Sequence, residues 1–195
     1  ADNRFISGAA GREFNNSGTF TKSVGTGITS INAPFNNTGT VNVQTGTLRL
    51  QGGGTSSGAA SGSISGSAIL EYSGGTHTLG ASSSVTGAGT VRFISGTVTI
   101  TGTYDFTGDS QVIGGTVAFN SAATLTTLNL SGGILTGAGD LNVTGLFTWD
   151  GGTSTMSGTG TTTANGGMSL NATTTITMNL GRQLVIPVGQ TATWT

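Results

Sequence analysis

The sequence predicts an all-β protein, a parallel β-solenoid (β-helix) in which about nine coils of roughly 21 residues stack on one another. Three observations predict this fold class. Short phrases recur at a nearly fixed interval, apolar residues alternate with polar ones in short runs, and glycine separates these runs. No long stretch free of glycine has the i, i+3, i+4, i+7 apolar spacing of a helix.

The repeated phrases set the length of one coil. The phrase FNNSGTF (14–20) returns as FNNTGTV (35–41), so the interval is 21 (35 − 14). The phrase LTGAGDL (135–141) returns as MSGTGTT (156–162), and this interval is also 21 (156 − 135). A catalytic loop is normally written once, whereas a phrase repeated at a fixed interval indicates repeated geometry.

The first phrase pair predicts corners of the solenoid. Asparagine tolerates the left-handed backbone of a tight corner, and stacked asparagines form side-chain ladders. Four residues are therefore predicted as structural corners: Asn15, Asn16, Asn36 and Asn37. Phe14 and Phe35 are expected to point inward.

Short strands of about three to six residues are expected between the glycines. The clearest runs are TVNVQTGTLRLQ (40–51) and TVRFISGTVTITGTYDF (90–106), in which apolar residues take alternate positions. The same pattern continues in GTVAFN (115–120), ATLTTLNLSGG (123–133), DLNVTGLFTWDGG (140–152) and TTTITMNLG (173–181).

These coils predict one continuous solenoid over residues 1–195, a segment or subunit of a longer fibre. Coils about 4.8 Å apart give a rod of roughly 40–45 Å. The competing fold is an antiparallel sandwich or barrel with similar strands. Such folds have no reason to repeat phrases at a fixed interval, so the solenoid is favoured.

The composition excludes several classes of function. The net charge is −1 from 6 basic and 7 acidic residues, and no Lys/Arg cluster marks a nucleic-acid site. Cys is absent, which removes disulfides and thiolate chemistry. No apolar run approaches the length of a transmembrane helix, about 20 residues. We therefore expect no cofactor, no nucleic-acid partner and no membrane insertion.

Several phrases resemble repeats of very large bacterial extracellular proteins. They include FNNTGTVNVQTGTLRLQGGGT, VTGAGTVRF, LNLSGGILTGAGDLNVTGLFTWDGG and the closing GRQLVIPVGQTATWT. The resemblance is to autotransporter-like and filamentous-haemagglutinin-like β-helix adhesins and related surface repeat proteins, and it covers almost the whole chain. It implies a secreted, elongated, right-handed β-helix in adhesion, matrix or fibre formation. It implies no site residue.

The few residues able to carry chemistry are sparse. His77 is the only histidine, lies in GGTHTL, and is expected to face solvent on a strand. Asp105 and Asp109 are the closest acidic pair, and two carboxylates held about 5–9.5 Å apart can hydrolyse a glycosidic bond. Turn formation is the more ordinary reason for such aspartates.

Aromatic and threonine residues suggest two further surfaces. Tyr104 and Trp149 are candidates for stacking on sugars, with Asp105 and Asp109 beside them as glycan contacts, although core packing is equally expected for Trp149. Threonine alternates in TVTITGT, TLTTL and TTTITM. Regular hydroxyl groups on a flat solenoid face can order water or bind ice. Thr is also an ordinary solvent-facing strand residue.

From these observations we expect a non-enzymatic structural or adhesive protein of a bacterial cell surface or extracellular matrix. A strand edge at the end of a solenoid recruits another chain unless it is capped. The expected partners are therefore neighbouring copies or repeats stacked end to end, together with surface glycans. The alternatives are a glycan-binding or polysaccharide-cleaving β-helix and an ice-binding solenoid.

Overall fold

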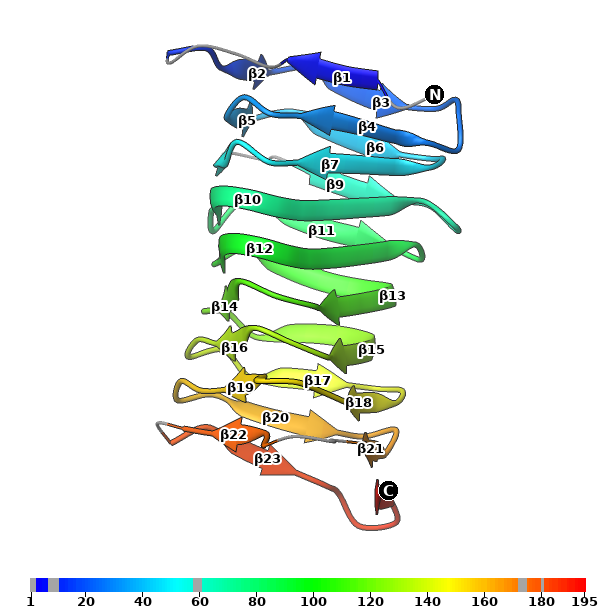
Figure 1. Ribbon diagram of the computed structural model, residues 1–195, viewed down its shortest axis with the longest axis vertical. Coiled ribbons are helices and arrows are strands. Elements are labelled where there is room, and N and C mark those ends of the chain that lie inside the picture. Colours follow the sequence, from blue (N-terminus) through cyan, green and yellow to red (C-terminus); the bar gives the residue numbers. More distant parts are fainter. Residues whose placement is uncertain (1–2, 7–10, 58–60, 172–174, 180) are drawn as a thin grey trace.

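The structure, a computed structural model, describes residues 3–6, 11–57, 61–171, 175–179 and 181–195. The chain winds from the N-terminal end to the C-terminal end in layers stacked along the long axis (Figure 1). The described residues contain no helix, and every strand pair among them is parallel. The predicted all-β parallel solenoid is confirmed, and the antiparallel alternative is wrong.

Three parallel sheets form the sides of the rod, and the strand pairs define them. The first sheet consists of β1 (Asn3–Ile6), β4 (Ile28–Ile31), β7 (Thr47–Leu50), the early parts of β10 (Ile69–Leu79) and β12 (Thr90–Ile100), the late parts of β13 (Thr103–Val112) and β15 (Ala123–Leu130), β18 (Phe147–Trp149), β21 (Met168–Leu170) and β24 (Ala192–Trp194).

The other two sheets follow the same order along the rod. The second sheet consists of β2 (Phe14–Asn16), β5 (Phe35–Asn37), β8 (Gly54–Ser56), the late parts of β10 and β12, β14 (Thr116–Phe119), β16 (Ile134–Thr136), β19 (Thr155–Met156) and β22 (Thr177–Met178). The third sheet consists of β3 (Thr19–Lys22), β6 (Thr40–Val43), β9 (Ser61–Ile64), β11 (Ser84–Gly87), the early parts of β13 and β15, β17 (Leu141–Val143), β20 (Thr161–Ala164) and β23 (Gln183–Val185).

Four strands are longer than the sequence predicts. β10 and β12 have 11 residues each, β13 has 10 and β15 has 8. Each of them runs across a corner and contributes to two sheets, so the strand continues where a turn was expected. Of the predicted strand at 173–181, residues 173, 174 and 180 lie outside the described residues.

The register explains the repeated phrases. Phe14 pairs with Phe35, and Leu135 pairs with Met156, so each copy of a phrase lies directly on the other. Between β4 and β21, the interval between paired residues of the first sheet varies by a few positions. The shortest is 18, from Asp109 to Thr127 (127 − 109), and the longest is 22, from Thr47 to Ile69 (69 − 47). The predicted winding of roughly 21 residues is therefore confirmed.

The core fills the space between the three sheets because successive strand residues point to opposite faces. In β12 and β15 the buried positions alternate with half-buried ones, except at the corner that each strand crosses. Burying a Leu or Phe side chain contributes about 1.5–3 kcal/mol, and stacked windings let every coil do so. The largest fully buried side chains are Trp149, Tyr104, Phe106, Phe119, Phe147, Ile31, Leu48, Ile64, Ile100, Leu125, Leu128 and Leu130.

Aromatic rings also stack from winding to winding. Phe14 and Phe35 lie parallel with ring centroids 5.2 Å apart, and Tyr72 and Phe93 do so at 5.6 Å. Phe35 is buried and Phe14 packs against the core, so the prediction that both point inward is confirmed.

A column of glycines lies along the corner between the first and second sheets. Gly75, Gly96, Gly115 and Gly133 all have positive φ, from +67° to +81°. A side chain at Gly96 would place its Cβ 2.3 Å from the carbonyl oxygen of Gly75. Only glycine fits this backbone and this close approach, which is why the GG or SG phrase recurs once per winding.

Candidate functional site

The predicted corner asparagines form two ladders on the second sheet. Asn16 Nδ2 donates to Asn37 Oδ1 (2.7 Å), and Asn36 Nδ2 donates to Asn15 Oδ1 (3.0 Å). The predicted position is wrong by one to two residues, because all four lie in β2 and β5 and the bends follow directly after them. Extended backbone holds the amides one above the other, and the asparagines thereby fix the register of the two windings.

A short ladder of charged residues lies on the outside of the first sheet. Arg49, Glu71 and Arg92 are in register on three consecutive windings. Glu71 is only 5% exposed, and its Oε1 accepts a hydrogen bond from Arg49 Nε. Arg92 Nε donates to Gln111 Oε1 (3.0 Å). The sequence intervals between these residues, 22 (71 − 49) and 21 (92 − 71), match the repeat length and could have predicted this ladder.

Two of the four candidate glycan contacts lie inside the rod. Tyr104 is buried, and its hydroxyl shares a hydrogen bond with Ser110 Oγ (2.8 Å). Trp149 is 1% exposed, and its Nε1 donates to Ser154 Oγ (2.7 Å). A sugar cannot reach either ring, so the prediction that they contact glycans is wrong. Both residues pack the core instead.

The two aspartates lie outside but on different sides. Asp105 is in the part of β13 that belongs to the third sheet, and Asp109 is in the part that belongs to the first. Asp109 Oδ1 accepts a hydrogen bond from Thr127 Oγ1. Because a corner separates them, the structure does not bring the two carboxylates together over one surface as glycosidase chemistry requires.

Asp109 does border a shallow groove of about 210 Å³ on the first sheet, together with Gln111, Asn129 and the exposed Leu146. A second groove of about 340 Å³ lies over the third sheet and includes Asp140. Both grooves offer hydrogen-bonding groups to a polar ligand.

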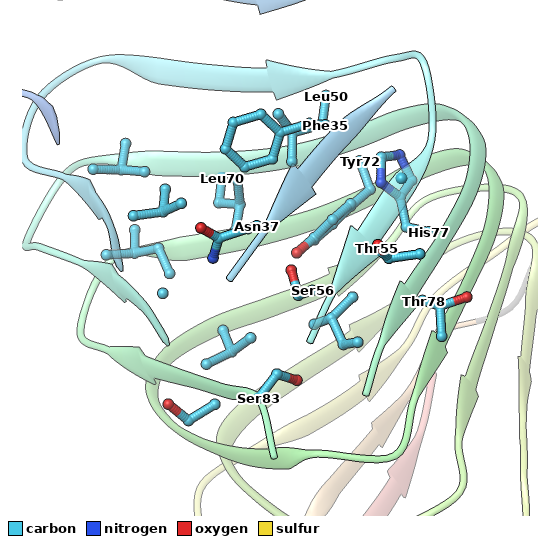
Figure 2. Close-up of a pocket in the computed structure, with 18 residues that line it drawn as sticks. Phe35, Asn37, Leu50, Thr55, Ser56, Leu70, Tyr72, His77, Thr78 and Ser83 are labelled. Carbon is cyan, nitrogen blue, oxygen red and sulfur yellow. The ribbon is translucent and has the colours of Figure 1, made fainter. Parts of the chain in front are cut away.

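His77 is buried, so the expectation that it faces solvent is wrong. It is 3% exposed and shares the inner face of β10 with Leu79, two residues on. Its Nε2 donates to the Gly74 carbonyl oxygen (3.0 Å), and its ring meets Tyr72 edge-on with centroids 4.9 Å apart (Figure 2). Burial lowers the pKa of His77 below its ordinary value of 6.5, and backbone hydrogen bonds to Gly74 and Leu50 raise it to a smaller degree.

This lowered pKa predicts that acid weakens the fold. Unfolded chain takes up a proton on His77 near pH 6.5, whereas the folded chain resists protonation until a lower pH. The contribution of His77 to the free energy of unfolding should therefore be constant above about pH 7 and fall as the pH drops below about 6.5. Urea denaturation between about pH 7.5 and 5.5 measures this slope.

The matched control is His77→Val, which continues the column with Val98, its register partner. The slope should disappear in this variant. An equal slope in both proteins would contradict the assignment to His77.

Threonines lie in register on the outside of the second sheet. Thr76 and Thr78 lie over Thr97 and Thr99, and the next winding has Thr116 and then Ala118 at the same places. The hydroxyl array that the TVTITGT phrase predicted is therefore complete on two windings and half present on the winding at each side, through Thr55 and Thr116. Residues 173–174 of the TTTITM phrase lie outside the described residues.

Arg182 is a buried cation that the sequence pattern did not single out. Its Nη1 and Nη2 donate to the carbonyl oxygens of Gly137 (3.1 Å) and Gly139 (3.2 Å), and its Nε donates to Thr162 Oγ1 (3.1 Å). Burial lowers the pKa of Arg182, and the charge of Asp140 raises it to a smaller degree. Arg182 thus links three windings through two backbone oxygens and one side-chain hydroxyl, and nothing in its surrounding sequence marks this role.

The two ends of the rod present strands with a partner on one side. Among the described residues, β1, β2 and β3 pair only with the winding below them, and β22, β23 and β24 only with the winding above. At the C-terminal end Trp194 is 70% exposed, and Val185 and Met178 are exposed nearby in the same last winding. At the N-terminal end Phe20 is half-buried and meets Phe35 edge-on at 5.9 Å. We call these two surfaces the end faces.

Within the described residues, no three His, Cys, Asp or Glu side chains are close enough to hold a metal ion. No helix there is long and apolar enough to cross a bilayer.

Comparison with family models, with curated proteins and with solved structures finds no match to this chain.

Proposed function

We propose that the chain is a non-enzymatic structural rod outside a bacterial cell, whose end faces stack on further β-helix windings of other copies or of neighbouring repeats. The mechanism is mechanical. Backbone hydrogen bonds run from winding to winding in all three sheets, and apolar columns run inside them. A further copy on the end face repeats the same pairing at the ordinary spacing of strands, about 4.8 Å.

One observation carries this proposal: at the C-terminal end of the described residues, the winding of β22, β23 and β24 exposes strand edges and large apolar side chains at once. β24 pairs with β21 on one side only, and Trp194, the register partner of Leu170, has most of its surface in solvent. An uncovered, apolar strand edge is a template for another chain. The half-buried Phe20 on the opposite end face offers an apolar counterpart.

Two features support an extracellular, adhesive or matrix setting. The repeated phrases resemble those of bacterial surface adhesins, whose β-helices are secreted. The exterior carries Asn and Thr ladders with few charges, which suits contact with neighbouring rods or surface glycans. The groove beside Asp109 is the place where a glycan would bind in this setting.

Replacing Trp194 tests the assembly. Trp194→Arg places a charge on the C-terminal end face and should weaken self-association by at least about 30-fold, because a buried Trp at an interface contributes about 2 kcal/mol or more. Sedimentation velocity over a range of concentrations measures the association, and negative-stain imaging shows whether filaments form.

The matched control is Thr193→Arg, because Thr193 is exposed beside Trp194 but pairs with Ser169 on the outward side of the sheet. This variant should assemble like the native chain. A native chain that stays a monodisperse monomer at high concentration would overturn the proposal.

A further inference from the structure

One winding of the rod has small side chains at its inward positions. Gly62 lies between Val41 and Val85 in the third sheet. In the second sheet Ser56 lies between Asn37 and Leu79. The columns of large side chains are interrupted at both places. The result is a cavity of about 40 Å³ between the sheets, near β5, β8 and β10 (Figure 2).

Two hydroxyl groups in this cavity have no hydrogen-bond partner among the described residues. Tyr72 is 5% exposed, and its hydroxyl makes no hydrogen bond to any described residue, so that burial alone raises its pKa. The Ser56 hydroxyl makes none either, and Figure 2 shows the two groups directed toward each other across the cavity. The neighbouring Asn37 is already satisfied by Asn16 and Gly39. A buried tyrosine hydroxyl ordinarily has a partner, and here the cavity leaves room for one.

The size and chemistry of the cavity identify this ligand. A water molecule needs about 10–15 Å³ of such volume and two to four polar partners, so 40 Å³ accommodates about three waters. A cavity lined only by hydrocarbon would stay dry. We propose that this cavity is a binding site for a cluster of about three water molecules that hydrogen-bond the hydroxyl groups of Tyr72 and Ser56.

The variant Gly62→Val tests the site by filling it. A Cβ at Gly62 would meet only the Ser84 carbonyl oxygen, at 3.8 Å, so the side chain has room to enter the cavity. Water-to-protein NOEs at the backbone amides around the cavity detect bound water in the native protein. We expect these signals in the native chain and in Gly18→Val, whose added Cβ would meet nothing within 4 Å, and their loss in Gly62→Val.

A second variant distinguishes a water-filled cavity from an empty one. If waters hydrogen-bond the Tyr72 hydroxyl, then filling the cavity leaves that hydroxyl without a partner and lowers the stability. Removing the hydroxyl should then restore part of the lost stability. The double variant Gly62→Val/Tyr72→Phe should melt about 2–4 °C above the value expected from adding the two single shifts. Additive shifts would contradict the proposal.

Xenon binding would directly reveal an empty, apolar cavity. A dry, apolar cavity binds xenon, whereas a water-filled polar cavity does not favour it. Chemical-shift changes around the cavity under xenon pressure, with no water signals there, would overturn the proposal. Absence of xenon binding together with the water NOEs supports it. Neither readout depends on whether the rods assemble end to end.

Discussion

Replacing Gly137 by alanine should lower the free energy of unfolding by about 4 kcal/mol. Gly137 has φ = +113°, a backbone region that residues with a Cβ rarely adopt. An added Cβ would also lie 2.0 Å from the carbonyl oxygen of Phe119 in the winding above. That oxygen belongs to the rigid backbone, so the windings themselves would have to move apart.

Two other glycines distinguish the cost of the positive φ from the cost of the close backbone contact. Gly181 has φ = +77° but nothing within 4 Å of its added Cβ, so Gly181→Ala should cost only the backbone strain, about 1 kcal/mol. Gly18 has neither a positive φ nor a close neighbour, and Gly18→Ala should be neutral or slightly stabilising. Urea denaturation followed by circular dichroism measures all three. A cost at Gly137 no larger than at Gly181 would show that the windings do not approach as closely as described.

Replacing Trp149 by alanine should cost about 3–5 kcal/mol, the range for removing a large core aromatic. The indole lies against Phe147, with ring centroids 6.2 Å apart, and donates to Ser154, which in turn donates to the Gly151 carbonyl oxygen (2.7 Å). The variant therefore opens a cavity and removes a buried hydrogen bond. Trp149→Phe keeps much of the ring and should cost less.

Trp194→Ala is the matched control for Trp149→Ala, because the same substitution at an exposed site removes little packing. It should change the stability of the isolated rod by less than about 1 kcal/mol. Thermal and urea unfolding at low concentration, where copies do not associate, measure both variants. Equal losses at the two tryptophans would be incompatible with the burial of Trp149.

The sequence was enough to predict the parallel stacking and its period, because in a solenoid a repeat in sequence is a repeat in space. Pairs such as Phe14 with Phe35 lie in register for this reason. The interval between windings varies along the rod because corners tolerate insertion, whereas the hydrogen-bonded strands do not.

The side of the strand on which each single residue lies was predicted less well, although the sequence alternation contained part of this information. Alternation in TYDF puts Tyr104 with Phe106 on one face of the strand and Asp105 on the other, so a ring and its neighbouring acid could never form one site. The same rule puts His77 with the apolar Leu79. Arg182 was unpredictable, because its partners are carbonyl oxygens of glycines two windings earlier in the chain.

The direction of the backbone hydrogen bonds has a consequence for a chain held under tension. They run along the rod, so a pull on the two ends loads them one layer at a time rather than all together. Each detached layer of roughly 20 residues releases about 60–70 Å of contour length, while the remaining layers keep their structure. Such a tether lengthens in steps and absorbs mechanical work without a single global rupture.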